Sequence, residues 1–171
     1  MIIDHLKRVN DVAWSPVAFL YFDYQDEDQQ TPTAVLSSLL KQIVATMPDI
    51  PKSISDVYEK HRKSGTPLAL DELEAILLDV YNELHQTTIL IDALDESRYR
   101  RTFLLLLGRL RQISNFRLFV TSRQSFQDIT EAFNHYPQIS ISAHDFDLKC
   151  YMRQEIDHAG VEDIVDDAFA N

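Results

Sequence analysis

One short apolar run that leads directly into acids most constrains how this chain can fold. The run is Ile89-Leu90-Ile91-Asp92-Ala93-Leu94-Asp95-Glu96. An uninterrupted apolar stretch such as 88–91 is typical of a strand buried on both faces, as in a parallel sheet covered by helices. Ligands of open parallel sheets bind at the carboxyl ends of the strands. The sequence therefore places Asp92, Asp95 and Glu96 where a binding site is expected.

These acids suit a hard cation and a bound water. Mg2+ is usually held by one or two carboxylates together with waters and substrate phosphates, while a neighbouring glutamate can orient a water. The pattern is typical of a Walker B motif. A second apolar strand, 116–122, leads into Arg123 and supports this interpretation. The alternative is a buried strand that ends in a solvated acidic turn.

The glycines argue against a Walker A motif within this sequence. A phosphate cradle of the form G-x-x-x-x-G-K-[ST] needs two glycines and a Lys-Ser/Thr pair in one short loop, because backbone N–H groups must turn inward around the phosphates. Gly65, Gly108 and Gly160 lie far apart, and lysine follows none of them. The Walker B pattern therefore stands without its usual companion.

Hydrophobic periodicity predicts that strands and helices alternate along the chain. Thr31 supplies an N-cap for one helix, and Asp71 with Glu74 predicts a capping box for another. The sequence predicts one α/β domain over residues 1–171, with a parallel sheet and helices on both faces. Strands are expected at 17–24, 88–91, 116–122 and 139–142, and helices at 1–10, 32–48, 54–63, 71–84, 98–114, 126–134, 146–158 and 161–170.

Charge and cysteine content limit the partners and the compartment. The formal net charge of -11 predicts repulsion from phosphates, which argues against nucleic acid and against an anionic membrane surface. No apolar run approaches the ~20 residues of a membrane helix. The single cysteine, Cys150, excludes an internal disulfide and fits a reducing compartment. We therefore expect a soluble, cytoplasmic protein.

Four segments together resemble the NACHT-type NTPase domains of the STAND class of signalling ATPases. They are FLYFDYQDEDQQTP, LLKQI, ILIDALDE and RLFVTSR. The likeness extends to the fungal NLR-like versions grouped with nephrocystin 3-like N-terminal domains, and it covers nearly the whole chain. NACHT domains place a small residue directly after the Mg2+-binding Asp and further acids two positions beyond it. Asp92-Ala93-Leu94-Asp95-Glu96 matches that pattern at each position.

The resemblance implies a P-loop NTPase-like fold and a role for each site residue. Asp92 corresponds to the acid that holds Mg2+, usually through water. Asp95 and Glu96 correspond to the catalytic acids that polarise the attacking water, with Glu96 as the general base. Thr121-Ser122-Arg123 corresponds to the nucleotide-binding strand end, and Arg123 stands in the sensor 1 position, where it would contact the terminal phosphate. The implied cofactors are Mg2+ and ATP, with GTP left open.

The resemblance also implies what this chain lacks. Family members begin with a strand and a glycine-rich loop that ends in Gly-Lys-Ser/Thr, and only then continue into the helix to which 1–10 would correspond. We therefore expect a domain truncated before Walker A, without the first strand and the P-loop. Such a chain would bind Mg2+ and ATP weakly, and its nucleotide hydrolysis would be lost.

Three interpretations remain open from the sequence. The chain is part of a signalling ATPase whose activity needs residues before Met1, and its partners are members of an NLR-like signalling assembly. Alternatively, it is a non-catalytic pseudo-NTPase or decoy that associates with itself or with intact NLR-like relatives through unpaired strand edges. The third interpretation is an unstable truncation, because loss of a central strand would remove much of a typical stability of about 5 to 15 kcal/mol.

Overall fold

The computed structural model describes Leu6, residues 15–112 and residues 116–159. These residues belong to two compact units, Met1–Asn134 and His135–Asn171. Leu6 is helical, but the rest of the predicted helix 1–10 and the whole predicted helix 161–170 lie outside the described residues.

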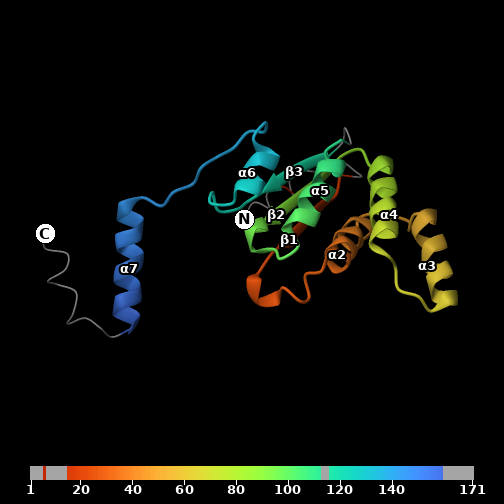
Figure 1. Cartoon of the computed structure of the whole chain (residues 1–171), viewed down its shortest axis with the longest axis horizontal. Coiled ribbons are helices and arrows are strands. Elements are labelled where there is room, and N and C mark those ends of the chain that lie inside the picture. Colours follow the sequence, from red (N-terminus) through yellow and green to blue (C-terminus); the bar gives the residue numbers. More distant parts are fainter. Residues whose placement is uncertain (1–5, 7–14, 113–115, 160–171) are drawn as a thin grey trace, which may run out of the picture. The chain divides into compact units, whose positions relative to one another are not determined.

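A parallel sheet forms the centre of the first unit (Figure 1). Its strand order is β1-β2-β3, and Phe19, Leu90 and Phe119 lie at one level across it. Every residue of the central strand except Asp92 is buried, as expected for a strand between two neighbours beneath covering layers. The predicted α/β class and the predicted parallel pairing are confirmed. The strands are β1 (Val17–Tyr21), β2 (Thr87–Asp92) and β3 (Phe116–Val120).

The helices follow the predicted order. A short 3-10 turn follows β1, and another follows β2. The first unit contains η1 (Tyr24–Asp26), α2 (Pro32–Val44), α3 (Lys52–Ser64), α4 (Leu70–Glu83), η2 (Leu94–Glu96), α5 (Arg100–Leu110) and α6 (Gln127–Phe133), and the second contains α7 (Asp145–Ala159).

The helix ends explain where the prediction is right and where it is wrong. Thr31 caps α2 as predicted, since its hydroxyl accepts the Ala34 N–H at 3.3 Å. The predicted Asp71–Glu74 capping box is wrong. Helix α4 begins at Leu70, which packs against the core, and the Glu72 carboxylate accepts the Ala69 N–H at 3.3 Å. The helix therefore starts one residue earlier than the acidic pattern indicated.

The predicted strand at 139–142 is also wrong. These residues form neither helix nor strand, and Ile139 and Ile141 are 84% and 90% exposed. An alternating apolar pattern becomes a strand only when a neighbour satisfies its peptide groups. No strand of the described chain pairs with this segment.

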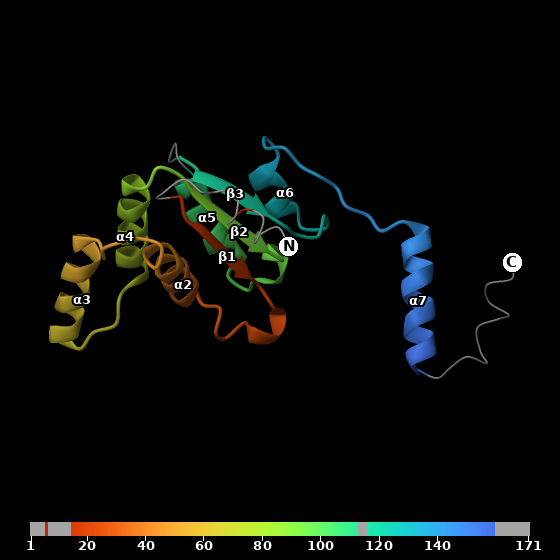
Figure 2. The ribbon, with the colours of Figure 1, turned by 180° about the vertical axis from the view of Figure 1, so that it is seen from behind.

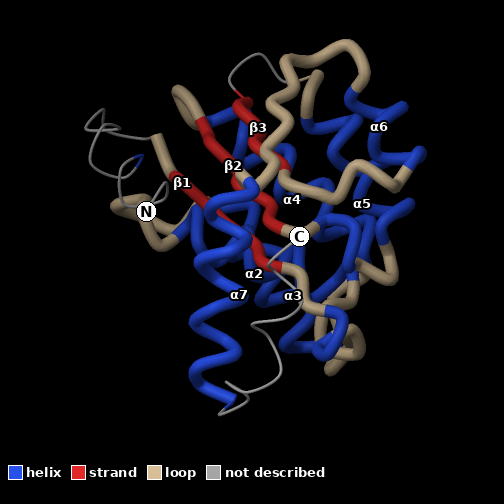
Figure 3. Tube along the Cα trace, turned by 90° about the vertical axis from the view of Figure 1, so that its left-hand side faces the viewer, coloured by secondary structure: helices blue, strands red, loops and turns tan. Residues whose placement is uncertain are grey.

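The main hydrophobic core lies between the sheet and helices α2, α4 and α5. Ala18 and Ile89 on one sheet face join Leu39, Leu77 and Leu107 from these helices in a single buried cluster. Figure 3 shows these helices together on one side of the three strands. The core holds the strands side by side, and their carboxyl ends consequently lie at one edge of the sheet. Helices on the opposite face stay a prediction.

Candidate functional site

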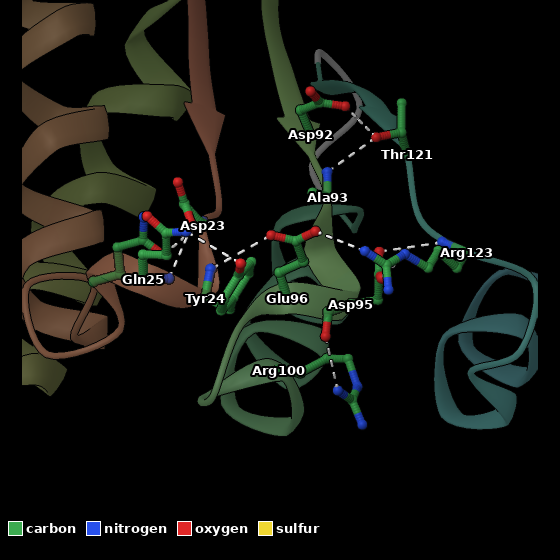
Figure 4. A network of polar contacts seen from close by, with 11 residues as sticks. Asp23, Tyr24, Gln25, Asp92, Ala93, Asp95, Glu96, Arg100, Thr121 and Arg123 are labelled. Carbon is green, nitrogen blue, oxygen red and sulfur yellow. Dashed lines mark hydrogen bonds and ion pairs between the residues drawn. The ribbon is translucent and has the colours of Figure 1, made fainter. Parts of the chain in front are cut away.

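The carboxyl ends of the three strands are joined by backbone hydrogen bonds. The Phe22 N–H donates to the Asp92 carbonyl at 3.1 Å, and the Thr121 N–H donates to the Ile91 carbonyl at 2.9 Å. The Leu94 N–H then donates to the Thr121 carbonyl at 3.1 Å. These bonds continue the sheet pairing past the strand ends, so the side chains that follow β1, β2 and β3 are brought close together (Figure 4).

Asp92 and Thr121 form the first contact at this edge. The Thr121 hydroxyl donates a hydrogen bond to Oδ1 of Asp92 and accepts the Ala93 N–H at 3.0 Å. Asp92 is exposed. Within the described chain, no hydrogen bond involves its second carboxylate oxygen, so that oxygen is accessible to a ligand.

Ala93 turns the chain sharply after β2. Its φ of 53° and ψ of 46° lie in the left-handed region, and it is the one non-glycine residue with positive φ in the described ranges. Such a conformation is costly for large or β-branched residues. The left-handed conformation therefore explains why a small residue follows Asp92. The turn at Ala93 lets η2 begin immediately after β2, and η2 carries Asp95 and Glu96.

Asp95 is the buried acid of this turn. Its side chain is 3% exposed, and Oδ1 accepts the Arg123 backbone N–H at 3.1 Å. The Arg123 Nε lies 3.5 Å from Oδ2. A buried carboxylate needs both a charge partner and hydrogen bonds. Arg123 supplies both, which fixes the loop after β3 onto the loop after β2.

Glu96 connects all three strand ends. Its Oε1 lies 3.0 Å from Nη2 of Arg123, and its Oε2 accepts the Tyr24 N–H at 3.4 Å. Arg123 itself is 70% exposed, whereas Glu96 is 21% exposed. The Glu96 carboxylate therefore bridges the turn after β1 and the arginine after β3, as Figure 4 shows.

A second arginine supports η2 from below. Arg100 Nη1 donates to the Asp95 carbonyl at 3.3 Å, and Arg100 Nε donates to Asp128 at 2.8 Å. The guanidinium also lies over the Phe126 ring, 4.7 Å from its centroid. The Arg100 guanidinium lowers the pKa of Asp128. Arg100 thus fixes α6 to the turn that carries the acids.

The structure brings together most of the residues that the sequence assigned to the site. Asp92 contacts Thr121, and Arg123 contacts both Asp95 and Glu96. Ser122 takes no part in these contacts, because its hydroxyl donates to the Arg123 carbonyl at 3.3 Å. Its assignment to cofactor binding stays a prediction.

Two residues of the network were not predicted from the sequence. Tyr24 acts through its backbone N–H, which leaves no signature in residue type. Arg100 belongs to an arginine-rich stretch, where an exposed helix face was the ordinary expectation, although its position five residues after Asp95 was the available signal.

Comparison with protein families identifies the chain. Residues 1–123 match the family model described as Nephrocystin 3, N-terminal. The chain belongs to this family. The match spans β1, β2 and β3 and ends at Arg123, so it includes every predicted site residue. Comparisons with curated proteins and with solved structures gave no match.

The site of this nephrocystin 3 N-terminal family member fits a cation that takes few protein ligands. In the described ranges, no group of three or more His, Cys, Asp and Glu side chains is arranged to hold a metal ion. Mg2+ does not need such a cage, because one or two carboxylates usually suffice when waters and substrate phosphates complete the octahedron. The accessible oxygen of Asp92 fits that role, while Asp95 and Glu96 are already paired with Arg123.

None of the described helices of this family member is both long enough and apolar enough to cross a bilayer.

Proposed function

We propose that this chain is part of a NACHT-type signalling NTPase domain with a P-loop NTPase-like fold, in which the end of β2 carries Walker B and the end of β3 carries sensor 1. The observation that carries the proposal is that two sets of contacts lie at one sheet edge, Asp92 with Thr121 and Arg123 with Asp95 and Glu96. Family membership and the parallel sheet support it. Parallel sheets bind ligands at this edge.

The proposed roles follow from exposure and pairing. When bound, Mg2+ and ATP supply a reactive phosphoryl group and the charge that neutralises it. Asp92 holds the cation, usually through water, with the oxygen that Thr121 leaves accessible. Arg123 contacts the terminal phosphate with an exposed guanidinium, and the buried Asp95 fixes its backbone. Glu96 is the general base.

The ion pair between Glu96 and Arg123 limits what each side chain can do at the same time. Nη2 of Arg123 lies 3.0 Å from Oε1 of Glu96. Arg123 would have to turn away from Glu96 to contact a phosphate, and Oε1 of Glu96 would then be free to accept a hydrogen bond from a water.

Our proposal includes the loss of nucleotide hydrolysis in this chain. Its sequence contains no G-x-x-x-x-G-K-[ST] segment. Without inward-facing backbone N–H groups and their lysine, the triphosphate is held by Arg123 and by a solvated cation alone. We expect a Kd for ATP no lower than ~1 mM, which corresponds to about 4 kcal/mol of binding free energy.

Isothermal titration of ATP with Mg2+ into the purified chain tests the assignment. We expect weak, Mg2+-dependent binding that Asp92→Asn and Arg123→Met abolish. Asp79→Asn serves as the matched control, because Asp79 is an exposed acid on α4. Binding that survives Asp92→Asn would contradict the site, and release of phosphate by the wild-type chain would contradict the loss of hydrolysis.

A second candidate function is a non-catalytic interaction module that associates with itself or with NLR-like proteins. The favouring observation is the outer edge of β3. Thr121 directs its N–H and carbonyl toward β2, so the alternation of a parallel ladder directs those of Leu118 and Val120 outward. In the described part of the chain, no hydrogen bond connects these outward groups to another segment. An open edge of this kind is a template for a further strand.

Light scattering after size exclusion distinguishes this second candidate. If the chain is an interaction module, we expect the fraction of dimer to increase with protein concentration. Leu118→Pro should abolish the dimer, because proline removes an outward N–H and is tolerated on edge strands. A monomer at every concentration, with no association to an intact relative, would rule the module out.

A further inference from the structure

In the described part of the chain, side chains and not a neighbouring strand cover the outer edge of β1. The Thr88 N–H donates to the Pro16 carbonyl at 3.0 Å, and Phe22 N–H donates to the Asp92 carbonyl at 3.1 Å, so these groups face β2. Peptide groups alternate in direction along a parallel ladder. Those of Phe19 and Tyr21 therefore face away from the sheet, toward α2, which contacts β1 (Figure 2).

Gln42 on α2 takes the place of a neighbouring peptide group. Its Oε1 accepts the Phe19 N–H at 3.0 Å, and its Nε2 donates to the Phe19 carbonyl at 2.9 Å. A carboxamide carries the same acceptor and the same kind of donor as a peptide unit. One side chain thus reproduces both hydrogen bonds that an added strand would form with Phe19.

Gln30 likewise forms hydrogen bonds with outward peptide groups at the end of the strand. Its Oε1 accepts the Asp23 N–H at 3.2 Å, and its Nε2 donates to the Tyr21 carbonyl at 3.4 Å. In the described structure, the Tyr21 N–H between these two glutamines has no hydrogen-bond partner. The two carboxamides therefore satisfy most of the outward peptide groups of β1, as an added strand would, but they leave the Tyr21 N–H without a partner in the described structure.

A groove lies beside this edge. It has a volume of about 300 Å³ and is lined by residues 19–22 of the β1 segment together with Gln30, Ala34, Ser38 and Gln42. The rings of Phe19 and Tyr21 lie edge to face, with centroids 5.8 Å apart, and Tyr21 is 51% exposed. Alternate side chains of an extended segment would find partly apolar walls here.

The acidic residues beside the groove indicate the charge of the segment that would bind there. Asp23, Asp26 and Asp28 are exposed directly beyond the carboxyl end of β1, and Oδ1 of Asp28 lies 3.8 Å from Nη1 of the exposed Arg98. A second copy of this chain would bring another net charge of -11 to the same place, and like charges at an interface oppose association. A basic segment complements the acids and would be attracted to this end of the groove.

We propose that the β1 edge is a binding site for an extended, basic peptide segment of another protein. The segment adds as a strand beside β1, displaces the carboxamides of Gln42 and Gln30, and places its basic residues against Asp23, Asp26 and Asp28. Exchange of one amide partner for another changes the hydrogen-bond energy little. The net gain comes from the Tyr21 N–H, from apolar contact in the groove and from charge pairing.

Fluorescence anisotropy with the whole chain tests the proposal. The probes are two labelled peptides of alternating valine and threonine, one with two lysines at its amino end and one with two at its carboxyl end, since the strand can run in either direction. We expect at least one of them to bind, and we expect Gln42→Ala to bind it about tenfold more tightly. That factor is about 1.4 kcal/mol, and it arises because the competing carboxamide is gone.

Ala34→Trp should abolish binding, because Ala34 is exposed, lines the groove and lies outside the sheet. Gln127→Ala is the control, since Gln127 bonds Glu131 on α6 and should leave affinity unchanged. Hydrogen exchange locates the site: the Phe19 amide should exchange faster in Gln42→Ala and be protected again when the peptide is bound. Thermal unfolding verifies that each variant is folded.

Several results would overturn the proposal. They are failure of both peptides to bind either wild type or Gln42→Ala, equal binding by peptides with aspartates in place of lysines, and unchanged binding by folded Ala34→Trp. Dimerisation of Gln42→Ala without peptide would make a second copy the occupant, which also contradicts it. None of these results depends on nucleotide binding at Asp92, so this inference and the proposed NTPase function can fail separately.

Discussion

The core beneath the sheet and the network at its carboxyl end hold the chain together in different ways. Leu77 and Ile89 are fully buried in an apolar cluster that depends on volume and contact. Arg123, by contrast, is 70% exposed and acts through directed contacts with Asp95 and Glu96. Burial stabilises strongly and accepts any apolar group of suitable shape, whereas exposed ion pairs stabilise little but require particular residues. The network therefore depends on the identity of its residues more than the core does.

The largest expected effect lies in the core. Leu77→Ala should lower the free energy of unfolding by about 2 to 5 kcal/mol, because it removes buried methyl groups and leaves a cavity. Leu105→Ala on α5 is the matched control, since Leu105 is 68% exposed and should change stability little. Urea unfolding measures both. Equal effects would break the contrast between core and surface.

The next effect concerns the turn that carries the acids. Ala93→Val should cost about 1 to 3 kcal/mol, because a β-branched residue is strained at φ 53°. Ala93→Gly should be neutral or slightly stabilising, since glycine adopts this conformation freely. Denaturant midpoints compare the two variants. A valine variant as stable as wild type would show that the turn is not held in the left-handed region.

Within the network, the two acids should differ. Asp95→Ala should cost about 1 to 3 kcal/mol, because it leaves the Arg123 N–H without its acceptor at a site where the Asp95 side chain is 3% exposed. Glu96→Ala should cost less than about 1 kcal/mol, because its partner Arg123 is exposed. Thermal unfolding of both variants tests the order. A larger cost at Glu96 would reverse our view of which acid is structural.

The smallest effect is a pH dependence at the contact between α3 and α4. Hydrogen bonds from Lys60, from the Ala69 N–H and from His61 lower the pKa of Glu72 from 4.5 to about 2. The Lys60 and His61 nitrogens lie 2.9 and 3.0 Å from its oxygens. Because the folded pKa is depressed, the stabilisation is complete above pH 4.5 and is lost as the pH falls toward about 2.

Melting temperatures of wild type and Glu72→Gln should therefore differ above pH 4.5 and converge toward pH 2. Glu83→Gln, at an exposed acid of the same helix, should show no such convergence. A constant difference between wild type and Glu72→Gln over the whole range would exclude this carboxylate as the titrating group.

Local patterns predicted most of the elements because their signals are carried by near neighbours. The apolar run before Asp92 gave β2, the Thr31 cap gave the start of α2, and Gly65 marked the end of α3, where its φ is 66°. The pattern at 139–142 failed for the opposite reason. A strand is completed by a partner that its own sequence does not contain.

The features of the site also differ in whether neighbouring residues or distant segments determine them. The order of acids after β2 could be found from the sequence, as could the basic end of β3. The pairing of Arg123 with Asp95 joins residues 28 positions apart, and its geometry depends on how β3 lies beside β2. Gln42 likewise has the pattern of an ordinary polar helix residue, and only the position of α2 beside β1 gives its carboxamide a role.

The sequence by itself determined the class of the fold, the parallel strands and the acids at the end of the central one, because periodicity and residue type act over a few neighbouring positions. The tertiary structure decided that Arg123 is paired with those acids and that glutamines cover the β1 edge. These contacts require atoms from distant segments to lie within about 3 Å of one another. Only the packing of the helices against the sheet brings those segments together.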